Sequence, residues 1–379
     1  MTYLDNAATS FPKPEAVYAA MDRFGRTQLA NPGRAGHKMA LASERLLDDG
    51  RHRLNQFVHG QGPERFVFTL NCTDALNIAI KGTVRPGDHV ITSDLEHNSI
   101  SRPLRALELA GTITLTRIAA DGSGTIDPEA VRKAITPKTR LVDLTHASNV
   151  LGTVQPVGEI GRIARERDLL FLVDAAQTIG VIPIDVQAMQ IDLLAFPGHK
   201  SLLGPTGTGA LYVGPRAELR PWREGGTGGD SASETQPREF PYFLEGGTPN
   251  VLGIAGLIAG LDYVEARGLD AIHRHEAGLV ERLWRRLDEL DGFTVYGHRD
   301  HARRVGTISF KCDALPAAEL GGILDHSFDI AIRPGLHCAP YVHRAIGTFP
   351  EGTVRVSPGP FNTADEIDRL AGALTEIVS

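Results

Sequence analysis

The sequence is poor in cysteine and has no long apolar run. Its 379 residues include only Cys72, Cys312 and Cys338. Three scattered cysteines without a CxxC pair exclude a disulfide framework and give no indication of zinc, so we expect no bound metal. No stretch approaches the roughly 20 apolar residues that a membrane helix needs, so we expect no association with a membrane.

Basic clusters and a secretory signal are also lacking. The 39 Lys and Arg residues are outnumbered by 46 Asp and Glu residues, which gives a formal net charge of −7. Because no basic stripe is available to neutralise phosphates, nucleic acid is not an expected partner. Residues 1–6 carry an acid where a secretory signal would carry lysines and then an apolar run. We therefore expect a cytoplasmic protein of enzyme size.

Short apolar runs alternate with helical stretches through the first half of the chain. The runs typical of buried strands are 66–68, 89–91, 141–144, 169–173 and 193–195. The stretches that favour helices are 74–81, 100–110, 128–134 and 157–166. This alternation predicts an α/β domain around a largely parallel sheet, in which ligands bind beyond the carboxyl ends of the strands.

A stretch rich in Gly, Ser and Pro over residues 222–249 interrupts this alternation and is too long for an ordinary connector. Long helices are expected after it, over about 252–266 and 272–290, followed by strands at 307–310 and 353–356 and a helix from Ala364. We interpret this part as a smaller α+β domain that the N-terminal segment completes. The expected domains are 16–264, and 1–15 together with 265–379.

One lysine stands where an apolar run meets a glycine-rich loop. Residues 192–200 read DLLAFPGHK, which ends at Lys200, and GPTG follows at 204–207. A lysine at such a place can lose its proton through desolvation, and a neutral amine can attack an aldehyde. Taken alone, the same pattern fits a surface lysine beside a loop.

A second apolar run ends in a carboxylate. Residues 169–177 read LLFLVDAAQ and place Asp174 at the end of the run. An Asp beside the ring nitrogen of pyridoxal phosphate keeps that nitrogen protonated and makes the ring an electron sink. Gln177 could then hydrogen-bond the phenolic oxygen of the ring. Taken alone, Asp174 could equally cap the following helix.

Together these segments resemble the class V aminotransferase group of pyridoxal phosphate enzymes, and within it the cysteine desulfurases and selenocysteine lyases. The resemblance runs from YLDNAAT at residues 3–9 to Arg355, with its motifs in the family's order and at about its spacing. It implies the α/β fold type I of these enzymes: a large domain with a mainly parallel seven-stranded sheet, and a smaller α+β C-terminal domain. The implied cofactor is pyridoxal 5'-phosphate, and the implied substrates are L-cysteine or L-selenocysteine.

The resemblance assigns four residues to the cofactor ring. Lys200 would bind the cofactor covalently and later move the substrate's α-proton. Asp174 and Gln177 would contact the ring nitrogen and the ring oxygen. His97, in LEHNS at 95–99, would stack on the ring and is counted with Lys200 among the catalytic residues. A histidine of the core is the alternative for His97.

Three further residues would bind the substrate. Asn149, in HASNVLG at 146–152, would lie near the ring oxygen and the substrate carboxylate, although an Asn of a turn is the alternative. Arg355 matches the arginine that binds this carboxylate, and a planar guanidinium suits such a bidentate contact. A surface ion pair is the alternative for Arg355, and Arg333 could assist it.

Phosphate binding is where the sequence departs from the family. Cys72 and Thr73 lie at the start of an expected helix, where free N–H groups favour an anion, but relatives often have a small hydroxyl residue or glycine in place of Cys72. Pro197 replaces a Ser or Thr that usually donates to the phosphate, and proline has no N–H. We expect the helix, His199 and Thr248 to bind the phosphate. The family places the residue that matches Thr248 on the partner subunit, which implies a homodimer with shared active sites.

The segment IRPGLHCAP at 332–340 decides between reactions. Arg333 and His337 could lower the pKa of the Cys338 thiol and raise its thiolate fraction. In cysteine desulfurases this loop carries the cysteine that attacks the substrate's sulfur and holds it as a persulfide, and the short loop resembles the type II branch. An inert structural thiol is the alternative, and Cys312 is expected to be structural.

The resemblance therefore implies a cysteine desulfurase that forms L-alanine and a persulfide on Cys338. The sulfur would pass to a thiol or an acceptor protein, as in sulfur metabolism and iron–sulfur cluster assembly. The alternatives are a selenocysteine lyase or another C–S lyase or aminotransferase of this group without a persulfide. A catalytically silent relative that binds partners in sulfur trafficking is a further alternative.

Overall fold

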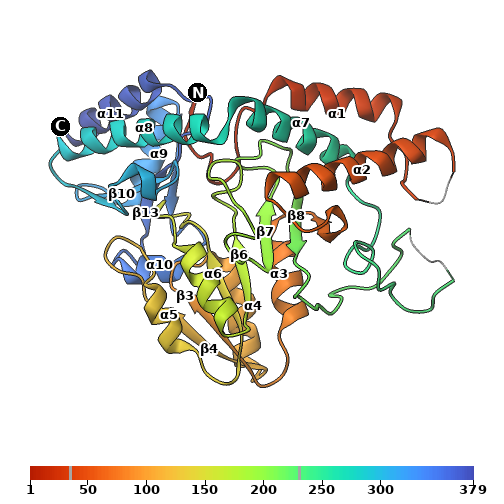
Figure 1. Ribbon diagram of the computed structural model, residues 1–379. Coiled ribbons are helices and arrows are strands. Elements are labelled where there is room, and N and C mark those ends of the chain that lie inside the picture. Colours follow the sequence, from red (N-terminus) through yellow and green to blue (C-terminus); the bar gives the residue numbers. More distant parts are fainter. Residues whose placement is uncertain (34–35, 229–231) are drawn as a thin grey trace.

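The computed structural model describes residues 1–33, 36–228 and 232–379. A large α/β unit is joined to a smaller α+β unit, and both chain termini lie in the smaller one (Figure 1). Among the helices of these described segments, none combines the length and the apolar character required to cross a bilayer.

A seven-stranded sheet with the order β2-β8-β7-β6-β5-β3-β4 forms the centre of the large unit. Its strands are β2 Phe66–Thr69, β3 Asp88–Ser93, β4 Ile113–Ile118, β5 Thr139–Thr145, β6 Leu170–Asp174, β7 Leu193–Pro197 and β8 Gly209–Val213. Only β8 runs antiparallel to its neighbours, so the expected mainly parallel seven-stranded sheet is confirmed. The pattern analysis missed β4 and β8.

Helices cover both faces of this sheet, because successive side chains of a strand point to opposite faces. The helices are α1 Glu15–Thr27, α2 Lys38–Phe57, α3 Cys72–Thr83, α4 Asn98–Leu109, α5 Pro128–Ala134, α6 Val157–Glu166 and α7 Val251–Arg267, with a 3-10 turn η1 at Pro63–Arg65. On β5, Val142 and Leu144 belong to one apolar cluster and Leu141 to another. The predicted bounds of α5 and α6 are confirmed, whereas α1 and α2 were not predicted.

The smaller unit has its own apolar cluster around an antiparallel sheet with the order β12-β13-β10-β9. Its strands are β9 Phe293–Tyr296, β10 Ile308–Cys312, β12 Arg333–Gly335 and β13 Thr353–Val356. Its helices are α8 Leu269–Asp288, α9 Ala317–Phe328, α10 Pro340–Ala345 and α11 Ala364–Val378, with a 3-10 turn η2 at His301–Arg303.

The N-terminal segment pairs with the C-terminal part of the chain. Strand β1, Thr2–Tyr3, lies parallel to β11, Ile330–Ala331. The domain limits at 15/16 and 264/265 stay a prediction, and α7 continues past residue 264 to Arg267. The loops that follow β3, β5, β6 and β7 carry five of the predicted site residues at the carboxyl ends of the strands: His97, Asn149, Gln177, His199 and Lys200.

Candidate active site

Lys200 follows β7 and lies among charged groups. Burial lowers its pKa; Asp174 and Cys72 oppose this shift, whereas the positive charges of Arg355 and Arg333 reinforce it. The net shift is downward, toward the neutral amine that a nucleophilic lysine requires.

Asp174 is the last residue of β6, and only one of its oxygens is engaged. Its Oδ1 accepts hydrogen bonds from the backbone N–H of Ala176 at 2.9 Å and from the Cys72 thiol at 3.4 Å. Burial raises the pKa of Asp174, while these hydrogen bonds and the charge of Lys200 lower it. Burial also raises the pKa of Cys72 well above its usual value, so this thiol is a neutral donor. Oδ2 has no hydrogen-bond partner within the described part of the chain.

The start of α3 offers donors beside this carboxylate. Asn71 caps the helix, since its side chain accepts a hydrogen bond from the N–H of Asp74 at 2.9 Å. The N–H groups of Cys72 and Thr73 begin the helix and have no intrahelical partner, nor any other among the residues described. Free N–H groups at a helix N-terminus favour an anion.

Two more predicted phosphate ligands have protein partners. The Thr73 hydroxyl lies 2.7 Å from Ser99 Oγ, and Nδ1 of His199 lies 3.1 Å from the Thr9 hydroxyl. Burial lowers the pKa of His199 to about 4, so the imidazole is neutral at pH 7. Pro197 ends β7 opposite Gly209, and as a proline it offers no N–H.

His97 caps α4 and is also uncharged. Its Nδ1 accepts a hydrogen bond from the N–H of Ser99 at 3.1 Å, so Nε2 carries the proton of the neutral ring. Burial lowers the pKa of His97 to about 4, and the charges of Lys200 and Arg333 contribute in the same direction. Gln177 donates from Nε2 to the Ala7 carbonyl at 3.3 Å.

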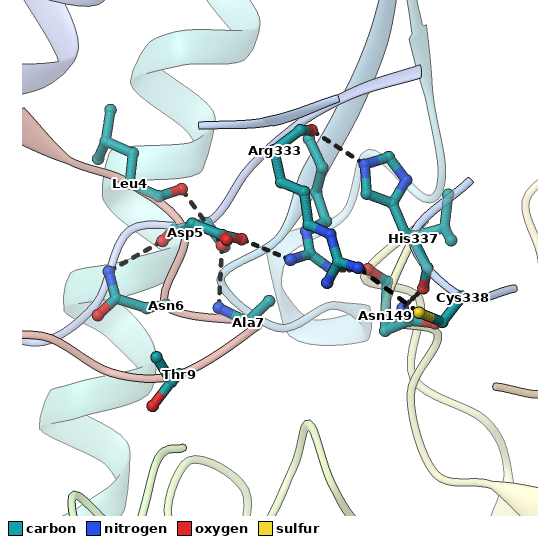
Figure 2. Close-up of polar contacts among 12 residues, drawn as sticks. Leu4, Asp5, Asn6, Ala7, Thr9, Asn149, Arg333, His337 and Cys338 are labelled. Carbon is teal, nitrogen blue, oxygen red and sulfur yellow. Dashed lines mark hydrogen bonds and ion pairs between the residues drawn. The ribbon is translucent and has the colours of Figure 1, made fainter. Parts of the chain in front are cut away.

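Arg355 lies opposite Arg333 in the register of β13 and β12. Its Nη2 contacts Oδ1 of Asp5 at 2.6 Å, and Nη1 donates to the carbonyl of Asn149 at 3.1 Å. Asp5 comes from the N-terminal segment, on which Figure 2 labels it between Leu4 and Asn6. Arg355 is 1% exposed, and its Nε is buried without a partner among the described residues. The Nε–H group of this side chain is therefore a donor without a partner among the described residues.

The loop that carries Cys338 is held from both units. Nη2 of Arg333 lies 3.5 Å from Cys338 Sγ (Figure 2). The carbonyl of His337 accepts a hydrogen bond from Nδ2 of Asn149 at 2.7 Å, and the carbonyl of Cys338 accepts one from the N–H of Asn98 at 2.7 Å. Since Asn98 and Asn149 belong to the large unit, this loop bridges the two units.

The expected role of His337 as a cation beside the thiol is wrong. Burial lowers the pKa of His337 to about 2, and the positive charge of Arg355 contributes in the same direction. A neutral imidazole adds no positive charge, so the positive charges near Cys338 are those of Arg333 and Arg355.

Most predicted residues converge, because Arg333 and Arg355 each interact with both Lys200 and Cys338. The residues joined by hydrogen bonds or charge interactions are Cys72, His97, Asn149, Asp174, His199, Lys200, Arg333, Cys338 and Arg355. Thr248 is apart from them. It is exposed and lines a cavity of about 380 Å³ together with Arg51 and Glu245.

The sequence reasoning missed three residues that contact this cluster. Asp5 pairs with Arg355, Ser99 links Thr73 to His97, and Lys13 donates to the His199 carbonyl at 2.7 Å. Asp5 lies within the YLDNAAT segment, so the sequence indicated the motif but gave no sign that Asp5 pairs with Arg355. No sequence signal marks Lys13 or Ser99.

Comparisons with known proteins assign this architecture to one family. The family Aminotransferase class-V matches residues 2–370. A probable cysteine desulfurase of Methanothermobacter thermautotrophicus is 38% identical over 381 residues, covering 99% of this chain and 94% of the relative. The apo cysteine desulfurase of Thermococcus onnurineus NA1 has a TM-score of 0.94 at 34% identity, over 100% of this chain and 94% of that one.

A second solved structure is similar at lower identity. The S-sulfonic acid form of the cysteine desulfurase CsdA from Escherichia coli has a TM-score of 0.90 at 27% identity, over 99% of this chain and 94% of that one. Both structural matches extend over the two units and the loops between them. The chain therefore belongs to the class V aminotransferase family.

Proposed function

We propose that the chain is a pyridoxal phosphate-dependent cysteine desulfurase, which converts L-cysteine to L-alanine and holds the sulfur on Cys338 as a persulfide. One observation carries this proposal: Cys338 and Lys200 share Arg333 and Arg355 as charged neighbours. The relatives named cysteine desulfurase, which match this chain over nearly its whole length, support the choice of reaction.

The residues present fit pyridoxal phosphate. The unpartnered Oδ2 of Asp174 suits a protonated ring nitrogen, and the free N–H groups of Cys72 and Thr73 suit a phosphate. Lys200 would hold the aldehyde carbon through Nζ, and His97 would lie against the ring. Thus one carboxylate oxygen and two backbone N–H groups match the ring nitrogen and the phosphate of pyridoxal phosphate.

When bound, pyridoxal phosphate supplies an electron sink for the bonds around the substrate's α-carbon. Lys200, whose pKa burial lowers, would take the α-proton through its amine. The free Nε of Arg355 would donate to the substrate carboxylate, which also lies near the positive charge of Arg333. Asn149 keeps the Cys338 loop near this site through the carbonyl of His337.

In the sulfur-transfer step, the Cys338 thiolate attacks the sulfur of the substrate. An S–S bond forms while the Cβ–S bond of the substrate breaks, and its electron pair remains with Cβ. A proton at Cβ then completes alanine, and Cys338 retains the persulfide. The guanidinium of Arg333 lies 3.5 Å from Sγ, so a positive charge stands beside the sulfur that attacks.

Replacing Cys338 by Ala tests the reaction. With cysteine and a reductant, the wild type should release alanine and sulfide in equal amounts. Cys338→Ala should lose alanine formation by about a hundredfold or more, because the sulfur has no acceptor. The visible absorbance of bound pyridoxal phosphate should persist in this variant.

Cys312→Ala provides the matched control, since Cys312 is a buried thiol on β10. It should retain the wild-type turnover of cysteine. Unchanged turnover of cysteine by Cys338→Ala would refute the persulfide step. Activity of that variant on selenocysteine alone would favour the selenocysteine lyase.

The assembly and the acceptor belong to the same proposal. A homodimer with shared active sites would bring the exposed Thr248 of one protomer to the phosphate of the other. The cavity beside Thr248 would then lie at or near the interface between copies. The sulfur-acceptor protein and the cytoplasmic location stay predictions.

A further inference from the structure

Behind the Cys338 loop lies a buried chain of three polar side chains. His337 Nδ1 lies 3.4 Å from Nε2 of His343, and His343 Nδ1 lies 2.7 Å from the hydroxyl of Thr348. His337 Nε2 lies 3.0 Å from the carbonyl oxygen of Arg333. His343 belongs to α10 and Thr348 follows it, and both are buried. Neither residue has a part in the reaction described above.

The carbonyl at one end of this chain sets the direction of its hydrogen bonds. A carbonyl oxygen only accepts, so His337 Nε2 donates to Arg333, and Nδ1 of the neutral ring accepts. His343 therefore faces this acceptor with Nε2 as the donor, and its ring also has a hydrogen bond with the carbonyl of Leu336. The Thr348 hydroxyl lies 2.7 Å from Nδ1 of His343 and 3.4 Å from the His343 carbonyl oxygen, and the shorter contact makes Nδ1 its main acceptor. Burial lowers the pKa of His337 to about 2 and of His343 to about 4, so both rings are neutral.

The backbone that this chain supports has an unusual conformation. His337 and Cys338 have φ angles of 49° and 57°, both in the left-handed region. For residues other than glycine, this conformation costs about 1–2 kcal/mol each and persists where neighbouring contacts hold it. Asn98 and Asn149 hold the two carbonyls from the large unit. The imidazole of His337 is held from the smaller unit by His343 and Arg333.

We propose that His343 and Thr348 are positioning residues, which orient the imidazole of His337 and thereby hold Cys338 Sγ beside the guanidinium of Arg333. The backbone carbonyl of Arg333 is the last acceptor of this chain of hydrogen bonds. The chain therefore ties the loop of Cys338 to the backbone of Arg333, the residue whose guanidinium lies beside Sγ. This inference rests on the proposed function for its consequence in catalysis. Its consequence for the reactivity of the thiol is independent of that function.

Thr348→Val removes the terminal donor and nearly preserves the side-chain shape. The alkylation rate of Cys338 by iodoacetamide, measured on its peptide by mass spectrometry without substrate, should fall at least about threefold, because the thiol moves away from Arg333. The kcat for alanine formation should fall about tenfold, with KM and the cofactor absorbance unchanged. Thr348→Ser restores the hydroxyl and should restore both rates.

Thr116→Val is a matched control for the loss of a buried histidine–threonine hydrogen bond. The Thr116 hydroxyl lies 2.9 Å from Nε2 of the buried His89, on β4 and β3 of the large unit. This variant should lower the melting temperature but leave the Cys338 alkylation rate and kcat as in the wild type. Equal behaviour of Thr348→Val and Thr116→Val in both rates would overturn the inference.

Two further outcomes separate this inference from the proposed function. Should the wild type form no alanine, the proposed function fails, while the alkylation rates still test the positioning role. Should Thr348→Val fail to fold, the alkylation rates of His343→Gln and Thr348→Ser test the inference instead. A wild-type rate of Cys338 alkylation in His343→Gln overturns it. Slow alkylation in His343→Gln together with wild-type rates in Thr348→Ser supports it.

Discussion

At the scale of single residues, the surroundings of Arg355 determine what this side chain can bind. Two arginines directly opposite each other in a sheet repel, and Arg333 lies opposite Arg355. Burial lowers the pKa of Arg355, while the charge and hydrogen bond of Asp5 oppose this shift. Asp5 thus offsets the repulsion, and Nε of Arg355 stays without a partner among the described residues.

Replacing Arg355 by Lys should therefore weaken substrate binding. An ammonium keeps the charge but loses the planar guanidinium. We expect the KM for cysteine to rise roughly tenfold to a hundredfold, since a charge-assisted hydrogen bond contributes about 1.5–3 kcal/mol, and kcat to change less. Steady-state rates of alanine formation give both constants.

Arg304→Lys is the control for the loss of a buried guanidinium. Arg304 is fully buried and donates to the carbonyls of His298 and Thr307 in the smaller unit. It should lower the melting temperature and leave KM unaltered. A KM that rises equally in both variants would contradict a specific role of Arg355.

At the scale of elements, the N-terminus of α3 is the part of the fold best suited to a phosphate. Asn71 caps this helix without using the N–H groups of Cys72 and Thr73. An Asp caps a helix about as well as Asn, but its negative charge repels a phosphate. Replacing Asn71 by Asp can therefore separate the folding of α3 from the binding of an anion at its N-terminus.

We predict that Asn71→Asp leaves the stability of the apo chain within about 0.5 kcal/mol of the wild type. Its affinity for pyridoxal phosphate should fall about tenfold or more, which is measured by titration of the visible absorbance. Thr363→Asp introduces a charge at the N-cap of α11 and should leave the affinity unchanged. If Asn71→Asp also bound the cofactor normally, the phosphate would have to lie elsewhere.

At the scale of the whole molecule, a buried acid lies where the two units meet. Glu276 of α8 is 5% exposed and lines a small pocket with Ala7 and Gln177. Burial raises the pKa of Glu276 to about 8. In the unfolded chain a glutamate has a pKa of about 4.3, so the folded chain retains a proton that the unfolded chain releases. The free energy of unfolding therefore falls as the pH rises between these two values.

Glu276→Gln should remove this contribution, because an amide does not ionise. Near pH 8.5 the variant should be more stable than the wild type by roughly 1–3 kcal/mol, and the difference should shrink toward pH 5. Urea unfolding at several pH values measures this difference. Glu319→Gln alters an exposed glutamate of α9 and should show no such pH dependence. A constant difference at all pH values would contradict the prediction.

Local patterns were sufficient for much of the fold and for the residues at strand ends. Apolar runs followed by polar residues predicted β6 with Asp174 and the turn after β7 with Lys200, because these signals span only a few residues. Strand β8 was missed since its run GALYV follows the glycine-rich loop directly and shows no alternation. Strand β4 alternates between apolar and polar residues, so its signal was present in the sequence although it was not predicted.

The sequence by itself determined the parallel sheet, the order of the motifs and the side chains that could do chemistry, because each depends on neighbouring residues along the chain. The tertiary structure alone decided the pairing of Asp5 with Arg355, which lie 350 positions apart. It also decided the neutral state of His337 and the separation of Thr248 from Lys200. The physical reason is that burial sets the charge of an ionisable group, and burial arises only when distant segments pack together.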